Sequence, residues 1–530
     1  MRDATPLLRT RRDLWSGRRV MIIDLPPGAH RRRGRMPLLC AMLSLLSPAV
    51  RGGDQPQWGE RWTRNQVSRE RHLPDSFDPN TGRNLRWKVR LGTETHSTPI
   101  ISGGRVYIGT NNGEPRDPRQ TGDRGVLMCL DERDGHLLWQ LVVPKREEDP
   151  YLDWPKSGIA SSATVEGDRV YIVSNRGEVL CLDARGMANG NDGPFREEGR
   201  HMTPKGTPAL EPGPTDADIL WVCDLPSVAG IWSHDAAHSS ILILGEYLYV
   251  NTGTGVDNTH KKIRTPDAPS LVVIHKRTGR LVARDDEHIA PKIFHCTWSS
   301  PSSARVGGRT LVFFAGGDGV LYAFEPYSGR ADPAAPALLK RVWRFDTDPS
   351  APKEEVHRYN TNRREGPSNV YGMPVFDAGR LYVAGGGDLW WGKNEAWIKC
   401  IDATRTGDTT ANALVWSHPL EKHVLSTPAV HDGLVFIADC GRNVQCLDQA
   451  TGRLLWTHET RGEFWGSPMV ADGKVYIGTR RGDFWVFAAT REKRILSTVE
   501  LGSPISGTAI PANGVLYIAT MTDLYAVGSP

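Results

Sequence analysis

One recurring sequence motif, which we call the phrase, constrains the fold of this chain more than any other feature. Its clearest copy, residues 97–139, holds Ser-Thr-Pro, then a Gly-Gly turn and an alternating apolar run, and ends with Asp, Gly and Trp spaced four residues apart. The phrase returns at residues 426–456 with the same final spacing. Weaker copies, which bring the number to eight, begin near Ser161, Ser239, Ser299, Gly372, Gly466 and Ser506.

Each copy contains short runs of β-branched and aromatic residues behind a Gly, Asp or Asn turn, a pattern typical of hairpin strands. Self-similarity at a spacing of roughly 40 residues, with four strands in each unit, indicates the blades of a β-propeller. We therefore predict an all-β fold for residues 77–530: one eight-bladed β-propeller made of four-stranded antiparallel blades.

The ends of the repeat region predict how the ring closes. The eighth copy stops at Val527 and lacks its outermost strand, whereas residues 86–89, near the other end of the repeats, resemble the last strand of a blade. A sheet protein avoids open edges, because an unpaired edge strand recruits other chains. We expect the N-terminal strand to complete the last blade.

Residues 1–49 have the pattern of a leader. Arginines at 31–35 precede an apolar stretch at 37–46, and small residues follow up to Ala49, as in a signal peptide of the Sec type. The apolar stretch is too short to span a bilayer. We expect a periplasmic or secreted protein without a membrane span, with residues 50–76 as a linker to the propeller.

The charge distribution argues against a nucleic-acid partner. Residues 1–49 hold ten Arg and three Asp, a net charge of +7, while the whole chain carries +4, which leaves −3 for the remainder. A basic face is therefore not expected on the propeller.

The cysteines do not indicate a redox or zinc centre. Four of them occupy equivalent positions in different copies, too far apart to pair, and are expected to pack as small apolar residues: Cys129, Cys181, Cys400 and Cys446. The spacing of Cys223, Cys296 and Cys440 signals neither zinc nor a disulfide framework.

Residues 129–139 and 446–456 resemble the tryptophan-docking motif of the quinoprotein alcohol dehydrogenase-like superfamily. Within it, the chain is most similar to a bacterial exported group, the PQQ-binding-like β-propeller repeat proteins. The residues that carry this similarity are 190–195, 269–271, 298–301 and 316–319. The resemblance implies an eight-bladed ring in which each motif Trp docks one blade on its neighbour.

The superfamily contains dehydrogenases that use pyrroloquinoline quinone (PQQ) and non-catalytic scaffolds of outer-membrane assembly. This sequence has no adjacent cysteine pair like that of the alcohol dehydrogenases, and no Cys-x-x-Cys-His haem site. The resemblance therefore favours a module that binds a ligand or a protein. A PQQ-dependent dehydrogenase or other oxidoreductase, with PQQ as a possible cofactor, is the alternative, and enzymatic activity stays open.

Chemically rich insertions gather on one face of the predicted ring, the face at which the chain enters the first strand of each blade. We call it the top face and expect a small molecule or protein to bind there. The residue three before each Ser-Thr-Pro proline, or its replacement, should line the central channel near this face; these residues are His96, Ala160, His238, Trp298, Tyr371, Leu425, Trp465 and Ser506.

Five of these eight residues are aromatic or His, which suits stacking of a flat ligand. His295, three residues before Trp298, should reach the same mouth. The predicted ligand-binding residues are thus His96, His238, His295, Trp298, Tyr371 and Trp465. In the alternative interpretation, the same side chains fill the channel by packing against one another.

Two further groups offer metal ligands, but neither has a spacing that specifies a metal, and no metal site is predicted. His and Asp residues on neighbouring top loops could bind metal or transfer protons, beside two tryptophans: His234, Asp257, His260, Asp388, Trp390 and Trp391. Oxygen ligands at Asp183, Asn189, Asn191 and Asp192 loosely resemble a calcium loop, but the terminal Glu is missing, so a surface loop is the other interpretation.

Overall fold

The computed structural model describes residues 53–147, 154–235, 239–329 and 335–529. The chain divides into two units, Met1–Ala49 and Val50–Pro530, and the second contains the fold. The predicted leader, residues 1–49, lies outside the described part of the chain, so its role as a signal stays a prediction.

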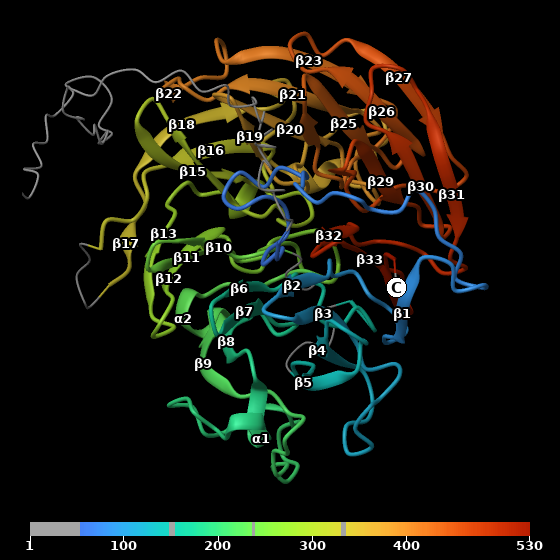
Figure 1. Cartoon of the computed structure of the whole chain (residues 1–530). Helices are drawn as coiled ribbons and strands as arrows, with labels where there is room; N and C mark the ends of the chain where they lie inside the picture. The colour runs from blue at the N-terminus through green and yellow to red at the C-terminus, as the bar shows by residue number, and fades with distance from the viewer. Residues whose placement is uncertain (1–52, 148–153, 236–238, 330–334, 530) are drawn as a thin grey trace, which may run out of the picture. The chain divides into compact units, whose positions relative to one another are not determined.

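Eight sheets form a closed ring, seven of them built from strands that follow one another along the chain and the eighth completed by an N-terminal strand (Figure 1). Blade 1 comprises β2 (Ile100–Ser102), β3 (Arg105–Asn111), β4 (Arg124–Asp131) and β5 (Leu137–Pro144). Blade 2 comprises β6 (Thr164–Glu166), β7 (Arg169–Val173), β8 (Glu178–Asp183) and β9 (Ile219–Asp224). Blade 3 comprises β10 (Leu242–Leu244), β11 (Tyr247–Asn251), β12 (Leu271–His275) and β13 (Leu281–Arg284).

The second half of the ring repeats this order. Blade 4 comprises β14 (Ser302–Val306), β15 (Arg309–Ala315), β16 (Val320–Phe324) and β18 (Arg341–Asp346), and blade 5 comprises β19 (Val375–Asp377), β20 (Arg380–Gly386), β21 (Ala396–Asp402) and β23 (Leu414–Leu420). Blade 6 comprises β24 (Ala429–His431), β25 (Leu434–Ala438), β26 (Asn443–Asp448) and β27 (Leu454–Glu459), and blade 7 comprises β28 (Met469–Ala471), β29 (Lys474–Gly478), β30 (Asp483–Ala488) and β31 (Ile495–Glu500).

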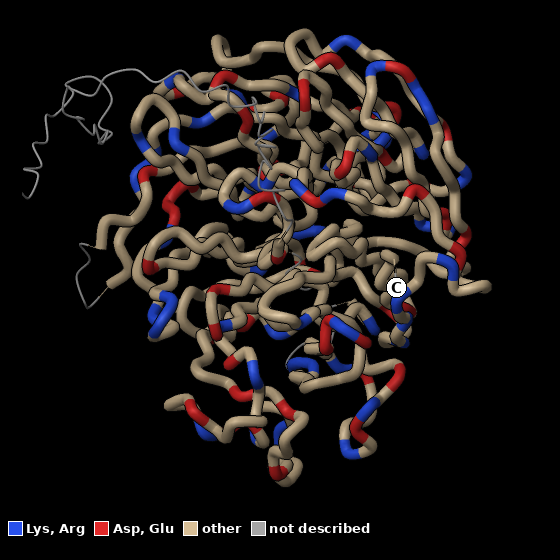
Figure 2. Tube along the Cα trace, viewed as in Figure 1, with Lys and Arg blue, Asp and Glu red and all other residues tan. Residues whose placement is uncertain are grey.

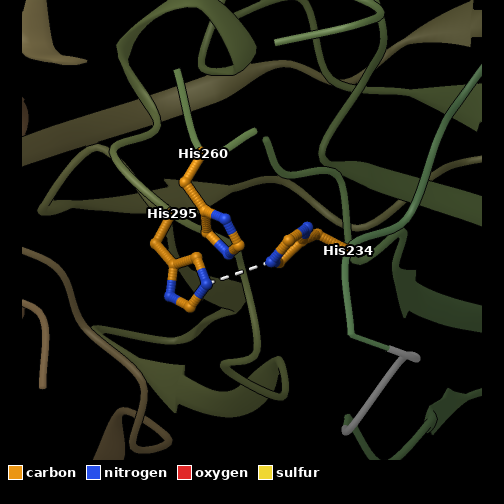
Figure 3. A group of neighbouring side chains, drawn as sticks. All are labelled: His234, His260 and His295. Carbon is orange, nitrogen blue, oxygen red and sulfur yellow. Dashed lines mark hydrogen bonds between the residues drawn. The ribbon is translucent and has the colours of Figure 1, made fainter. Parts of the chain in front are cut away.

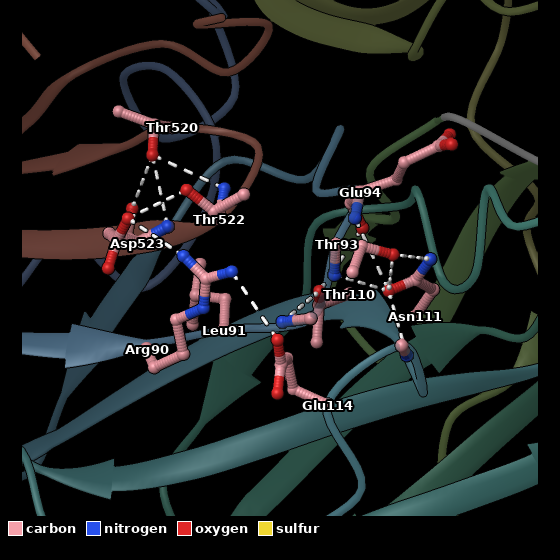
Figure 4. Close-up of polar contacts among 12 residues, drawn as sticks. Arg90, Leu91, Thr93, Glu94, Thr110, Asn111, Glu114, Thr520, Thr522 and Asp523 are labelled. Carbon is pink, nitrogen blue, oxygen red and sulfur yellow. Dashed lines mark hydrogen bonds and ion pairs between the residues drawn. The ribbon is translucent and has the colours of Figure 1, made fainter. Parts of the chain in front are cut away.

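Blade 8 closes the ring as predicted. Its strands β32 (Ile510–Ala512), β33 (Val515–Ala519) and β34 (Asp523–Val527) come from the C-terminal end, and its outer strand is β1 (Leu85–Arg90). β1 pairs antiparallel with β34, with Val89 opposite Leu524. Arg90 in β1 adds ion pairs with Asp523 of blade 8 and with Glu114 of blade 1, each at 3.4 Å (Figure 4). The eight-bladed all-β prediction is confirmed.

Two blades differ from the four-stranded prediction, and a few short helices interrupt the strands. A fifth strand of two residues pairs in parallel with the outer strand of blade 3 and of blade 4: β17 (Ala337–Leu338) and β22 (Gly407–Asp408). The helices are α1 (Glu198–His201) and α2 (Leu225–Ala229), with 3₁₀ turns at Gly186–Asn189, Ala290–Lys292 and Val356–Tyr359.

The motif tryptophans dock neighbouring blades on one another. Trp416 of blade 5 donates its indole N–H to the carbonyl oxygen of Gln449 in blade 6 at 3.0 Å. Its ring covers Gly452, where φ is +70° and an added Cβ would lie 2.5 Å from the indole. Trp139 makes the matching pair of contacts with Ala184 and Gly186. The motif glycine is therefore required both by its backbone conformation and by the ring packed on it.

Residues 50–76, expected as a linker, are instead bound to the ring where the structure describes them. Between residues 54 and 70 the chain forms hydrogen bonds with all eight blades, on the face opposite the top face. Its partners, one from each of blades 1 to 8 in order, are Ile101, Val165, Ser240, Ser303, Phe376, Val430, Val470 and Gly514. We call residues 54–70 the crossing segment. Backbone groups at the ends of the inner strands need partners, and the crossing segment supplies them.

The seven cysteines among the described residues are all free and buried, and for Cys129, Cys181, Cys400 and Cys446 this is what the packing interpretation predicts. Acidic and basic residues are interleaved over the blades in the view of Figure 2, in keeping with the absence of a predicted basic face. Within the described ranges, no helix has the length and apolar character needed to cross a membrane.

Candidate functional site

A cavity of about 650 Å³ opens at the top face of the channel. Of the eight residues predicted to line this mouth, the seven that the structure describes all border it: His96, Ala160, Trp298, Tyr371, Leu425, Trp465 and Ser506. His238 lies outside the described residues. His295 borders the cavity as well. The predicted positions therefore converge, whereas ligand binding by them stays a prediction.

Aromatic side chains form a continuous wall around this cavity. His96 stacks on Trp465 with ring centroids 6.0 Å apart and planes at 23°. Trp465 meets Trp390 edge to face at 6.0 Å, and Trp390 meets Trp298 in the same way at 5.7 Å. Trp298 lies 4.9 Å from Tyr371. The wall joins residues from blades 1, 4, 5 and 7, because each comes from a loop at the top face.

Polar groups border the cavity at separate points. The Arg480 guanidinium lies over the Trp465 ring, 4.3 Å from its centroid, and donates to Ser506 Oγ at 2.5 Å. Burial lowers the pKa of Arg480. Glu94 lies near Arg480, and its charge partly offsets the effect of burial on the Arg480 pKa. The backbone N–H groups of Glu94 and Thr93 both donate to Asn111 Oδ1, at 3.3 and 2.8 Å, and position this loop (Figure 4).

Three histidines from three different loops point toward one another at the edge of this cavity (Figure 3). His234 precedes β10, His260 lies between β11 and β12, and His295 precedes β14. One ring nitrogen from each lies within 4.8 Å of the other two, and Nε2 of His234 is 3.0 Å from Nε2 of His295. We call these residues the histidine cluster. Asp235 Oδ2 lies 3.3 Å from His234 Nε2 and 3.7 Å from His295 Nε2.

A buried carboxylate orients the histidine cluster. Asp388 Oδ2 is 2.9 Å from Nδ1 of His295 and accepts the Tyr371 hydroxyl at 2.6 Å. Its other oxygen accepts the backbone N–H groups of Trp390 and Trp391. Burial alone would raise the pKa of Asp388, but His295 and these donors lower it. Burial would likewise lower the pKa of His295, and the charge of Asp388 raises it instead.

The loop between β11 and β12 brings the histidines together. Gly255 in this loop packs so closely that an added Cβ would lie 2.5 Å from His234 Cβ and 2.6 Å from the carbonyl oxygen of His295. The carbonyl oxygen of Asp257 accepts the N–H of His260 at 2.9 Å, which positions that residue at a φ of +56°. Burial, with the charges of the other two histidines, lowers the pKa of His260.

Several residues that border the cavity had no signal in the repeat: Trp58, Glu94, Trp154, Asp235 and Arg480. Trp58 belongs to the crossing segment, and its indole N–H donates to Thr508 Oγ1 at 3.1 Å. Because these residues fall outside the positions that recur from blade to blade, a comparison of the copies does not single them out.

The loop that loosely resembles a calcium loop brings together only part of the set of oxygen atoms suggested by the sequence. Carboxylate oxygens of Asp183, Asp192 and Asp218 lie within 4.8 Å of one another. Asp218 comes from the end of the insertion between β8 and β9, and burial raises its pKa. Asn189 and Asn191 bond instead to Asp192 and Glu198. Calcium binding at this loop stays untested.

Comparison with known proteins shows which proteins share this fold. A family model described as outer membrane protein assembly factor BamB matches residues 76–186 and 394–520. The crystal structure of BamB from Moraxella catarrhalis shares 12% sequence identity and covers 83% of this chain and 98% of its own, with a TM-score of 0.50. A europium-containing methanol dehydrogenase shares 12% identity and covers 90% and 98%, with a TM-score of 0.57. No curated protein matches the sequence. At these identities the structural similarity is one of fold.

Proposed function

We propose that this chain, a β-propeller of the PQQ-like superfamily, is an exported protein that binds a small molecule with a flat ring in the cavity at its top face. The observation that carries the proposal is the convergence of Trp298, Tyr371, Trp390 and Trp465 on one open cavity. The leader-like pattern of residues 1–49 supports the export part of the proposal.

The dimensions and chemistry of the cavity support a ligand over a packed plug. Its volume of about 650 Å³ is that of a small-molecule site, since such sites span roughly 300 to 1,000 Å³. Aromatic faces contribute stacking to a flat ring, and the few polar groups beside them would fix its orientation. A channel filled by its own side chains would leave no such volume.

PQQ fits the described lining poorly. The cofactor carries three carboxylates, whereas Arg480 is the one guanidinium or ammonium group among the described residues that border the cavity. Glu94 and Asp235 add negative charge there, which would repel a polyanion. We therefore derive no catalytic step through PQQ and propose binding in preference to dehydrogenation.

A protein partner at the same face is the second mode of binding, in line with the assembly factor that the matching family model describes. The two modes differ in what Trp465 does. A flat ligand would enter the cavity and stack on its ring, which is only partly exposed. A protein would contact the loops around the mouth and leave the cavity walls untouched.

Isothermal titration with adenosine, riboflavin, and PQQ with Ca²⁺ tests the proposal. We expect at least one of these flat compounds to bind saturably. The variant Trp465→Ala should weaken that binding roughly tenfold or more, which corresponds to about 1.4 kcal/mol of lost stacking. Trp62→Ala is the matched control, because Trp62 is an exposed Trp of the crossing segment that does not border the cavity.

Dye reduction with simple alcohols and sugars, measured in the presence of PQQ and Ca²⁺, should show no turnover. The proposal is wrong if none of the flat compounds binds and Trp465→Ala lowers the melting temperature as a packing residue would. Stoichiometric PQQ uptake with turnover would restore the dehydrogenase alternative.

A further inference from the structure

We infer that His234, His260 and His295 form a binding site for one divalent transition metal with the ligand preference of zinc. The inference goes beyond the proposed function, because the metal would bind to these histidines whether or not a flat molecule occupies the cavity. It starts from the convergence of three imidazole nitrogens within 4.8 Å of one another.

The spacing of the histidine cluster suits a single metal ion. Two imidazole nitrogens bound to zinc at about 2.0 to 2.1 Å in tetrahedral geometry lie about 3.3 Å apart. Nε2 of His234 and Nε2 of His295 are 3.0 Å apart, and the third nitrogen is close enough to join them after a small rotation of its ring. Nitrogen ligands select zinc and its neighbours and disfavour calcium and magnesium, which take oxygen.

Asp388 supplies the second, independent observation. Metal-binding histidines usually donate their remaining N–H to a carboxylate or a carbonyl group, which fixes the tautomer and turns the other nitrogen toward the metal. Asp388 Oδ2 lies 2.9 Å from Nδ1 of His295 and is fully buried. This contact directs the lone pair of His295 Nε2 toward His234, as a metal ligand requires.

The local backbone is built for this convergence. Gly255 separates His234 from His295, and no larger residue fits there without displacing one of them. The backbone N–H of Val256 donates to the carbonyl oxygen of His295 at 2.9 Å, so one loop holds the second and third histidines in register. A site that is this constrained loses little entropy when the metal binds.

Three protein ligands leave one position of a tetrahedral ion open. His260, His295 and Asp235 all border the cavity, so the open position faces it. Zinc sites with three protein ligands and an open position hold water or a donor atom of a bound molecule. Asp235, 3.3 Å from His234 Nε2, is positioned to accept a hydrogen bond from that water or donor.

Zinc titration of the full chain tests the inference. The protein is stripped with EDTA, and ZnCl₂ is titrated into it by calorimetry. We expect one zinc per chain with submicromolar affinity. Asp388→Asn should weaken zinc binding roughly 10- to 100-fold, as loss of an orienting carboxylate does. His260→Ala should weaken it further, because it removes a ligand. His431→Ala, which changes a partly exposed histidine at the end of β24, should bind zinc like the wild type.

Cobalt substitution provides a readout that folding defects do not mimic. Co²⁺ bound to the stripped wild type should give the visible absorption of a tetrahedral site with nitrogen ligands, and His260→Ala should lose it. His260→Gln serves as the second variant if His260→Ala melts well below the wild type. The inference is overturned if zinc fails to bind the stripped wild type, or if both His260 variants bind it as tightly as the wild type does. Calorimetry with flat compounds on the EDTA-treated protein tests the proposed function separately.

Discussion

Glu178 at the start of β8 shows how a single residue couples stability to pH. It is buried, and its Oε2 lies 3.0 Å from Nε2 of His201 in α1, while Arg176 pairs with its other oxygen at 3.3 Å. Burial would raise the pKa of Glu178, but the charges of His201 and Arg176 lower it to about 2. The folded state therefore holds this carboxylate ionised at a pH where the unfolded chain has taken up a proton.

Because folding lowers the pKa of Glu178, this residue stabilises the folded protein less as the pH falls. The stabilisation by Glu178 is complete above its usual pKa of 4.5 and is lost as the pH falls from there toward 2. The unfolded chain binds at most one more proton at Glu178 than the folded protein does. This residue therefore contributes at most about 1.4 kcal/mol per pH unit to the slope of the free energy of unfolding against pH. We expect urea unfolding of Glu178→Gln to show a flatter dependence over this range than the wild type. Glu355→Gln, at an exposed position, should keep the wild-type slope.

The limits of sequence prediction are also visible at single residues. Trp298, Tyr371 and Trp465 could be placed at one mouth, because they occupy equivalent positions in a repeat and the ring carries each of them to the same height. The sequence placed His234, His260 and Asp388 on neighbouring top loops and His295 at the same mouth, but it could not predict that their side chains meet. These residues do not recur from blade to blade, and their loops differ in length, so only the folded paths of the loops bring the side chains into contact.

At the scale of one element, the crossing segment has no repeat pattern and reads in the sequence as a linker. Its role depends on Arg64, which is fully buried and bonds only to uncharged groups among its described partners. Nε donates to the carbonyl of Pro301 at 3.0 Å, and the two Nη groups donate to the carbonyls of Trp58 and Ser240 at 2.9 and 3.1 Å. Burial lowers the pKa of Arg64 to about 9.

Arg64→Ala should therefore destabilise the protein by roughly 3 kcal/mol, because it leaves three carbonyl groups without their donor, and those of Pro301 and Ser240 are buried. Denaturant unfolding followed by tryptophan fluorescence measures this loss. Arg61→Ala is the matched control, since the Arg61 side chain is 59% exposed, approaches Glu166 at 3.8 Å and lies 4.9 Å from the ring centroid of the exposed Trp62. Its expected effect is within about 0.5 kcal/mol. Equal effects of the two substitutions would show that the crossing segment adds little to the ring.

At the scale of the whole molecule, β1 closes the ring and the crossing segment spans it, and two truncations separate these contributions. A chain that begins at Asn84 keeps β1 and lacks the crossing segment, whereas one that begins at Leu91 lacks both. We expect the first to melt below the full chain and stay monomeric. The second should also associate in size-exclusion chromatography, because β34 then has a free edge. Identical melting and elution of the two chains would contradict closure by β1.

The sequence could predict this closure because the eighth repeat lacked a strand and an N-terminal segment matched it.

The central claim concerns the cavity at the top face, and a crystal structure of the full chain with the tightest-binding flat compound tests it most directly. The account predicts electron density for the compound inside the cavity, with its ring in contact with Trp298 or Trp465. A channel mouth filled by these side chains, with the compound bound elsewhere on the protein, would contradict it.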